Sequence, residues 1–233
     1  MLGRTGLLLG LVAAPHASAL RTAVIRSTAV RLCASVGAGC NVVDTRSLPS
    51  REQAATAERM ATVVNWAYRG KNPEGDESAW TGERHLLSGT RTTASDVLGM
   101  LRAADDEGAA ARAIFLATRS DECLGTIQVE AGPSSSDGGK EAEVGLFSVD
   151  PDLQGQGVGK ALLRTAEQHA TKQMGAELAV LWVITSRAEL ISWYERLGYV
   201  RTEKTVPFPT DANVGVPVDG MSLEFVRLEK PLV

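Results

Sequence analysis

Residues 143–170 read EVGLFSVDPDLQGQGVGKALLRTAEQHA, and this stretch decides how the rest of the chain is interpreted. Its apolar start, 144–149, predicts a strand that Pro151 ends, because proline cannot donate a ladder hydrogen bond. Three glycines form the turn that follows: Gly155, Gly157 and Gly159. From Val158 onward, apolar residues recur at helical spacing. A turn of this kind leaves backbone N–H groups uncovered beside the positive end of a helix dipole, which suits a phosphate group.

The spacing of the glycines separates the possible phosphate ligands. A dinucleotide fingerprint needs a third glycine where Lys160 stands. A P-loop needs glycine at Gln154 and Ser or Thr at Ala161, so a nucleotide hydrolase is disfavoured. What remains is Q-x-x-G-x-G, carried by Gln154, Gly157 and Gly159. From this stretch alone, a turn that only packs the helix against the sheet stays open as the alternative.

Periodicity and breakers predict the other elements. Strands are expected at 41–48, 113–118, 124–129, 144–149, 178–185, 199–206 and 221–228. Helices are expected from Ser50 to about Tyr68, from Thr93 to the turn at 105–108, from Val158 to Ala170, and over 187–197. The resulting order is β-α-α-β-β-β-α-β-α-β-β.

The glycine pattern resembles the pyrophosphate-binding signature of the GNAT superfamily of N-acetyltransferases. A second segment, ISWYERLGY at 191–199, resembles the family's Y-x-x-x-G-[FY] motif. The two motifs stand at the family's separation within the family's element order, and the resemblance covers roughly residues 42 to 231. It implies an α/β (α+β) fold for residues 41–233, with a mixed central sheet of about six to seven strands flanked by about four helices.

The first 40 residues differ in composition from the rest and are expected to form a targeting leader. A basic start, a short apolar centre and an A-x-A site at 17–19 fit a signal peptide, and the Arg-, Ser- and Thr-rich stretch after it fits a transit peptide. This combination resembles the bipartite leader of plastid proteins, with a mitochondrial or a secreted destination as the alternatives. The leader's apolar run is too short to span a bilayer.

The GNAT resemblance implies that acetyl-CoA is the co-substrate and that a primary amine, on a small molecule or a protein, attacks it directly. The cofactor's pantetheine arm would lie on Phe147, Ser148 and Val149. Its pyrophosphate would lie on the turn and the start of the helix: Gln154, Gly155, Gln156, Gly157, Val158, Gly159 and Lys160.

Two residues stand at the family's catalytic positions. Tyr194 matches the general acid that protonates the departing thiolate, and a phenol holds its proton at neutral pH. Glu143 matches the glutamate that serves as general base in the histone-acetyltransferase branch, with Glu141 as the substitute if the register differs. The alternatives to catalytic roles are that Tyr194 is a core residue and that Glu143 faces solvent at the start of a strand. Where many relatives carry asparagine, this chain has Arg187, which would pair with a CoA phosphate or cap a strand end.

The loops of the predicted fold indicate where the substrate would be selected. Substrate choice is expected to lie in the segment between the first two helices and in the loop at 207–220, with Trp80, Arg84 and His85 as candidate contacts.

The cysteines and histidines show no metal-binding spacing, and Cys123 has no histidine beside it in the sequence to make it a nucleophile. A net charge of −4 gives no case for nucleic acid or an anionic membrane. A monomer or homodimer is expected, and a non-catalytic acyl-CoA-binding module is the competing function.

Overall fold

The computed structural model describes residues 34–36, 40–72, 80–120, 122–132, 140–209 and 214–232. The strands are β1 Ala34–Val36, β2 Cys40–Asp44, β3 Leu87–Ser88, β4 Arg112–Arg119, β5 Glu122–Ala131, β6 Glu141–Val149, β7 Leu178–Ile184, β8 Val200–Pro207, β9 Val216–Pro217 and β10 Glu224–Pro231. The α-helices are α1 Gln53–Arg69, α2 Ala94–Glu107, α3 Val158–His169 and α4 Ala188–Glu195. Within these ranges, no helix has the length and apolar character needed to cross a bilayer.

Eight of the described strands form one mixed sheet in the order β1-β2-β4-β5-β6-β7-β10-β8. Neighbouring strands are antiparallel except β6 and β7, which are parallel. The expected strand and helix order is confirmed. The additional strand β1 pairs with β2 and lies within the predicted leader, whose residues 1–33 and 37–39 are outside the described ranges.

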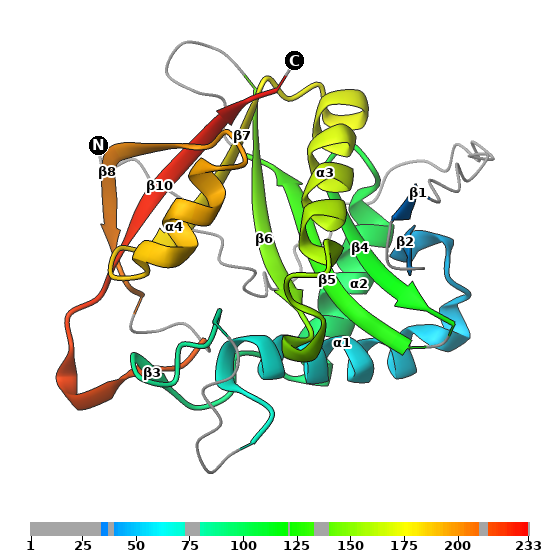
Figure 1. Ribbon diagram of the computed structural model, residues 1–233. Helices are drawn as coiled ribbons and strands as arrows, with labels where there is room; N and C mark the ends of the chain where they lie inside the picture. The colour runs from blue at the N-terminus through cyan, green and yellow to red at the C-terminus, as the bar shows by residue number, and fades with distance from the viewer. Residues whose placement is uncertain are drawn as a thin grey trace, which may run out of the picture.

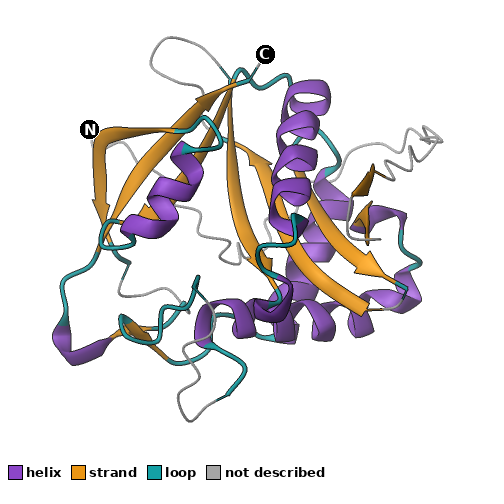
Figure 2. Ribbon diagram, in the orientation of Figure 1, coloured by secondary structure: helices purple, strands orange, loops and turns teal. Residues whose placement is uncertain are grey.

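Helices cover the two faces of the sheet separately (Figures 1 and 2). On one face, α3 and α4 bury alternate strand residues such as Val144 and Leu181 together with Leu162 and Tyr194. On the other face, α1 packs against β5 and β6 and α2 against β4, with Ile114 among the residues buried there. Strand alternation therefore assigns each side chain of β7, and of β6 as far as Gly145, to a known face.

Two local predictions at the N-terminal side of the domain are wrong. The first strand ends at Asp44 because the Asp44 side chain accepts the Arg46 backbone N–H at 3.0 Å and starts a 3₁₀ turn over Thr45–Ser47. The first helix begins at Gln53 and not at Ser50, which lies in a second 3₁₀ turn. By contrast, the capping box predicted at Thr93 is present, with reciprocal hydrogen bonds between Thr93 and Asp96.

The central feature of the sheet is the divergence of β6 from β7. The two strands pair only from Glu141 to Glu143, opposite Leu178 to Val180, and then separate (Figure 1). Just beyond this point Leu146 has φ +45°, and the register between β5 and β6 shifts between Thr126 and Gln128. A leucine at positive φ marks a bulge that turns the strand, so residues 147–149 present an edge that β7 does not pair.

Candidate active site

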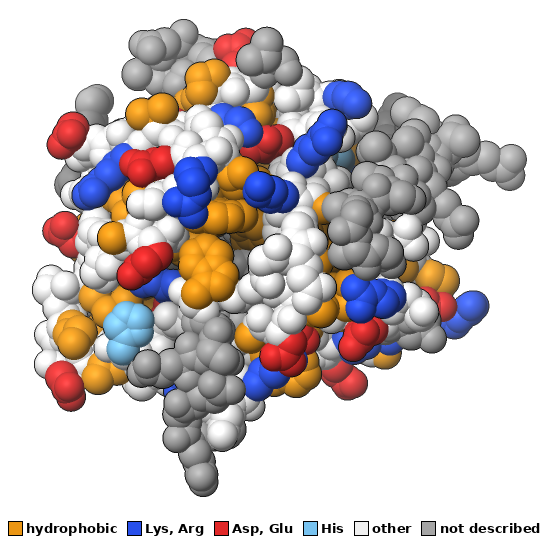
Figure 3. All heavy atoms as spheres, viewed as in Figure 1, with side chains coloured by type: hydrophobic (Ala, Val, Ile, Leu, Met, Phe, Trp, Pro, Cys, Tyr) orange, Lys and Arg blue, Asp and Glu red, His pale blue; other side chains and the backbone are white. Residues whose placement is uncertain are grey.

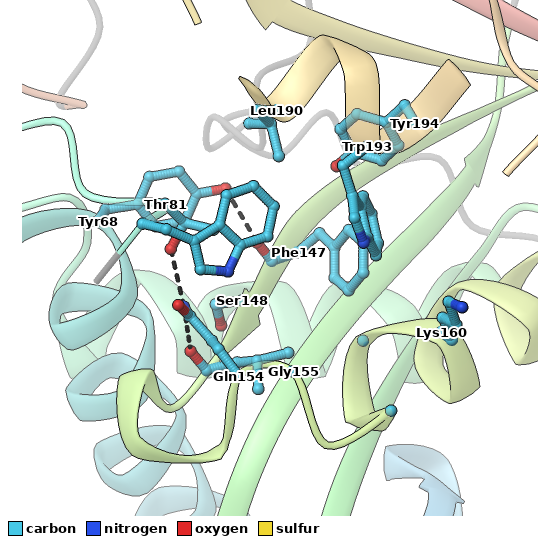
Figure 4. A pocket seen from close by; sticks show the side chains of 14 residues that line it. Tyr68, Thr81, Phe147, Ser148, Gln154, Gly155, Lys160, Leu190, Trp193 and Tyr194 are labelled. Atoms are coloured by element: carbon cyan, nitrogen blue, oxygen red, sulfur yellow. Dashed lines mark hydrogen bonds between the residues drawn. The ribbon is translucent and has the colours of Figure 1, made fainter. Parts of the chain in front are cut away.

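A pocket of about 340 Å³ opens beside the unpaired edge of β6, mainly on the face covered by α3 and α4, and reaches Tyr68 at the end of α1. Its wall combines residues from α1, the segment after α1, β6, the glycine turn and α4: Tyr68, Trp80, Thr81, Phe147, Ser148, Val149, Gln154, Gly155, Gly157, Gly159, Lys160, Leu190, Trp193 and Tyr194. Figure 4 shows these side chains around the cavity. On the surface, hydrophobic side chains gather near the middle of this face, with several Lys and Arg side chains around them (Figure 3).

The glycine turn has the conformation that its residues predict. Gly155 and Gly157 have φ +79° and +89°, which side-chain-bearing residues rarely adopt. The first intrahelical hydrogen bond of α3 runs from the Ala161 N–H to the Gly157 carbonyl. The preceding N–H groups of the helix are therefore free of intrahelical partners and lie at the positive end of its dipole.

The hydrogen bonds of Gln154 explain why an amide side chain stands at the start of the turn. Its Nε2 donates to the Val149 carbonyl at 3.2 Å and to Thr81 Oγ1 at 2.9 Å, so it joins the strand end, the turn and the segment after α1 (Figure 4). Its Oε1 is buried and has no hydrogen-bond partner among the described residues, and the same is true of Ser148 Oγ. Both side chains line the pocket, which leaves polar atoms there for a ligand.

Of the ten residues predicted to hold the cofactor, eight line the pocket. Val158 is fully buried in the core beneath α3, so only its backbone is near the turn. Gln156 is exposed, and its side chain donates to the Asp152 carbonyl at 3.1 Å. Lys160 lines the pocket and is exposed.

Tyr194 lies on α4 in an aromatic cluster, with ring-centroid distances of 5.0 Å to Trp193 and 5.6 Å to Tyr199. Burial raises the pKa of its phenol far above the ordinary value, and nearby Arg187 lowers that pKa in part. The hydroxyl therefore holds its proton at neutral pH, as a general acid must.

Glu143 lies on the opposite face of the sheet from Tyr194, because its neighbours on β6 face α3. It is partly buried and stands opposite Glu130 on β5. Burial, and after it the Glu130 charge, raise the pKa of its carboxyl to about 7, against the lowering effect of a hydrogen bond from Trp182 and of the Arg227 charge. A carboxyl with a pKa near neutrality is suited to accept and release a proton at physiological pH.

The alternative base, Glu141, is committed to another contact. It is 7% exposed, and its Oε1 lies 2.8 Å from Arg227 Nη2 on β10. Glu143 has no ion pair of this kind among the described residues. The structure therefore favours Glu143 over Glu141 as the group free to exchange a proton.

Arg187 caps the end of β7 through its backbone, whose N–H donates to the Ile184 carbonyl at 2.9 Å, while its side chain is committed to contacts within the protein. It is 3% exposed, and its guanidinium donates to the carbonyls of Trp80 and Thr81 at 3.0 and 3.1 Å. It also lies 3.6 Å from Glu83, which in turn lies 3.3 Å from Arg69. This buried charge cluster holds the segment after α1 against α4 and so fixes one wall of the pocket.

The segments predicted to select the substrate meet on the Glu143 face. Leu87 and Ser88 pair with Pro217 and Val216 in the short β3–β9 ladder. Around it, a third apolar cluster joins both segments to β7 and β10: Leu86, Leu87, Ile184, Phe208, Val214, Leu223 and Phe225, with Trp182 packed against them. Of the three candidate contacts, Trp80 lines the pocket, while Arg84 and His85 are exposed.

Tyr68 was not predicted from the sequence. Its hydroxyl donates to the Phe147 carbonyl at 3.1 Å, at the unpaired edge of β6, and it lines the pocket (Figure 4). Nothing in the sequence distinguishes it from other residues near the end of α1, because its partner lies on a distant strand. Cys123, already disfavoured as a nucleophile from the sequence, is buried, and this burial raises the pKa of its thiol to about 12, which opposes thiolate formation near neutral pH. The described residues contain no group of three or more His, Cys, Asp or Glu able to hold a metal ion.

Comparison with known proteins identifies the family. The sequence profile of the Acetyltransferase (GNAT) family matches residues 80–199, which is more than half of the chain. The chain belongs to the GNAT acetyltransferase family. The match contains the glycine turn, α3 and α4, and therefore most of the pocket wall described above.

Relatives within the GNAT family include mycothiol acetyltransferase of Cellulomonas flavigena, which is 32% identical over 169 residues, or 67% of this chain and 47% of that protein. An uncharacterised N-acetyltransferase of Methanocaldococcus jannaschii is 39% identical over 62 residues, or 27% of each chain. The chain thus spans about half or less of the length of these relatives.

Solved structures support the fold. A putative acetyltransferase, yncA of Salmonella typhimurium, was solved with acetyl-CoA and superposes with a TM-score of 0.54 at 18% identity, covering 84% of this chain and 95% of that one. An N-acetyltransferase of Staphylococcus aureus superposes with a TM-score of 0.57 at 14% identity, covering 83% and 99%. At these identities the likeness establishes the GNAT fold.

Proposed function

We propose that the protein transfers an acetyl group from acetyl-CoA to a primary amine by direct attack. The observation that carries the proposal is a single pocket that joins the unpaired β6 edge, the glycine turn at the start of α3 and the buried phenol of Tyr194. These are the elements that a long, phosphate-bearing thioester and its leaving thiol require.

The residues present fit acetyl-CoA. Tyr68 and Gln154 donate to the carbonyls of Phe147 and Val149 from the open side of β6. Since the N–H and C=O of a strand residue point the same way, the N–H groups of these two residues also face the unpaired edge. They are donors for the carbonyl oxygens of a pantetheine arm or of the thioester. The orphaned Ser148 Oγ and the first N–H groups of α3 supply further partners.

The chemistry of the transfer assigns a task to each face of the sheet. The amine nitrogen forms a bond to the thioester carbonyl carbon while the C–S bond breaks, which releases a thiolate and leaves a surplus proton on nitrogen. Tyr194, on the α3–α4 face, donates its proton to the thiolate, and the surplus proton on nitrogen returns to the tyrosinate, directly or through water. Glu143, on the opposite face, removes a proton from the ammonium form of the amine before attack, either directly or through a water.

Replacing Tyr194 with phenylalanine is expected to lower kcat about 100-fold, because the leaving thiolate loses its proton donor. The dissociation constant of acetyl-CoA should stay within about twofold of the wild-type value, since the aromatic packing is retained. Steady-state thiol release and calorimetric titration measure the two quantities. A kcat within about threefold of wild type would remove Tyr194 from the mechanism.

Replacing Gly159 with alanine is expected to weaken acetyl-CoA binding about tenfold without loss of stability. The added Cβ would lie 3.6 Å from the Phe147 ring and 3.8 Å from that of Trp193, so it enters the pocket without a clash. Alanine is also the better helix former, by about 0.5–1 kcal/mol. Gly99→Ala on α2, where a Cβ meets no heavy atom within 4 Å and lines no part of the pocket, is the matched control. Unchanged acetyl-CoA affinity in Gly159→Ala would show that the cofactor does not approach this backbone.

The proposed function is tested by titrating the protein with acetyl-CoA in a calorimeter and then following thiol release with a panel of polyamines, aminoglycosides, amino acids and peptides. Binding together with amine-dependent release would support the proposal. Binding without release for any amine would favour a regulatory acyl-CoA-binding module. Absence of binding would leave the glycine turn with a packing role only.

A further inference from the structure

An open space lies on β6 at the point where β6 and β7 begin to diverge. A Cβ added at Gly145 would meet no heavy atom within 4 Å in the described part of the chain. Gly145 follows the last β6–β7 pair, that of Glu143 with Val180, by two residues. It therefore shares the face of Glu143 and lies at the start of the β6–β7 gap, the stretch in which these two strands no longer pair.

Gln128 borders this space with an unsatisfied acceptor. It is the cross-strand partner of Gly145 on β5 and is 3% exposed. Its Nε2 donates to Glu130 Oε2 at 3.2 Å, but its Oε1 has no hydrogen-bond partner among the described residues. Native structures seldom leave a buried acceptor without a donor, so this oxygen indicates a missing N–H or O–H group.

The charges on this face also lack one cation. Glu130 is paired with Arg112 at 3.0 Å, and Glu141 is paired with Arg227 at 2.8 Å. Glu143, between them, accepts a hydrogen bond from Trp182 and feels the charge of Arg227, but no cation among the described residues lies within ion-pair distance of it. A group that brings both a positive charge and N–H donors would satisfy Glu143 and Gln128 together.

We propose that the space over Gly145 is the acceptor subsite, and that it holds the nitrogen of a primary alkylamine between the Glu143 carboxylate and Gln128 Oε1. This inference rests on the proposed acetyl transfer. Gln128 Oε1 accepts an N–H from the nitrogen before and after Glu143 has taken its proton, so it orients the neutral amine for attack through the gap. A carboxylate next to the amine would be repelled by Glu143 and by the acidic neighbours, which selects against α-amino acids.

Two single-site variants test the subsite by their effect on amine binding, measured separately from acetyl-CoA binding. Gln128→Leu removes the acceptor oxygen, and Gly145→Ala fills the open space. Both are expected to raise the KM for the amine about tenfold or more and to leave the dissociation constant of acetyl-CoA within about twofold. Gly99→Ala, a glycine with equally open surroundings on α2, should leave both values unchanged.

Two lysine derivatives test the substrate class in the same thiol-release assay. Nα-acetyl-lysine amide offers only a side-chain amine, whereas Nε-acetyl-lysine offers only an amine beside a carboxylate. We expect the first to have a kcat/KM at least tenfold higher than the second. Preference for the second derivative, or an unchanged amine KM in both variants of an active protein, would overturn the subsite but leave the proposed function standing. If the wild-type protein releases no thiol with any amine, the proposed function fails and the subsite fails with it.

Discussion

Replacing Glu143 with glutamine is expected to lower kcat for amine acetylation by about 100- to 1,000-fold, because the substrate ammonium loses its proton acceptor. The affinity for acetyl-CoA should not change, since Glu143 is not among the residues that line the pocket. In the wild type, burial raises the pKa of this carboxyl to about 7, so kcat/KM should rise with pH up to about that value and then level. The glutamine variant should lack this limb of the profile.

The same substitution is expected to increase stability at alkaline pH. The folded-state pKa of about 7 lies above the ordinary value of 4.5, so folding binds a proton between these two values. The free energy of unfolding therefore falls as pH rises from about 4.5 to about 7. Glutamine imitates the protonated carboxyl and avoids this loss. We expect a gain of about 2 kcal/mol for Glu143→Gln at pH 8 and almost none at pH 4.5, measured by urea unfolding.

Two results would contradict this account of Glu143. A kcat within about threefold of wild type would show that another group takes the proton. An unfolding free energy that is equal in the two proteins at pH 8 would show that the fold does not raise the pKa of this carboxyl. The variant Glu141→Gln serves as the comparison for activity, because it keeps the Glu143 carboxyl and changes its paired neighbour.

Replacing Glu83 with glutamine is expected to lower the free energy of unfolding by about 3 kcal/mol. Glu83 is 8% exposed and is the shared anion of Arg69 and Arg187. Glutamine keeps the size of the side chain but leaves two buried guanidinium groups without a counter-charge. Denaturant unfolding at neutral pH measures the loss.

The matched control for this prediction is Glu52→Gln. Glu52 lies 3.7 Å from Arg51, and both side chains are largely exposed, so its loss should change stability by less than about 0.5 kcal/mol. The Glu83 variant should also bind acetyl-CoA more weakly, because Arg187 would no longer hold Trp80 and Thr81 in the pocket wall. A loss of stability as small as that of the control would show that the buried cluster does not fasten this wall.

The sequence was informative where structure depends on near neighbours. The strand, the glycine turn and α3 follow from residues close together in the chain, and the cap at Thr93 and Asp96 is equally local. The first helix started later than predicted because Ser50 forms no side-chain cap, while Gln53 instead donates to Asp105 on α2. That contact belongs to tertiary packing and has no local signal.

The rest of the site could not be predicted, because it depends on contacts between distant segments. Tyr68 and Phe147 are 79 positions apart, and Arg187 reaches Trp80 across 107 positions. The bulge at Leu146 places a leucine at positive φ, which no propensity favours, and it decides which side chains face the pocket. Likewise, the subsite between Gln128 and Glu143 exists only because β5 and β6 are paired in one particular register.

The most direct test of the account is an initial-rate measurement in which acetyl-CoA and an amine are varied together and thiol release is followed. Direct attack across the β6–β7 gap requires both substrates to be bound at once. The account therefore predicts amine-dependent release with double-reciprocal lines that intersect. Parallel lines would indicate an acetylated enzyme intermediate, and release that does not depend on the amine would contradict acetyl transfer to an acceptor on the Glu143 face.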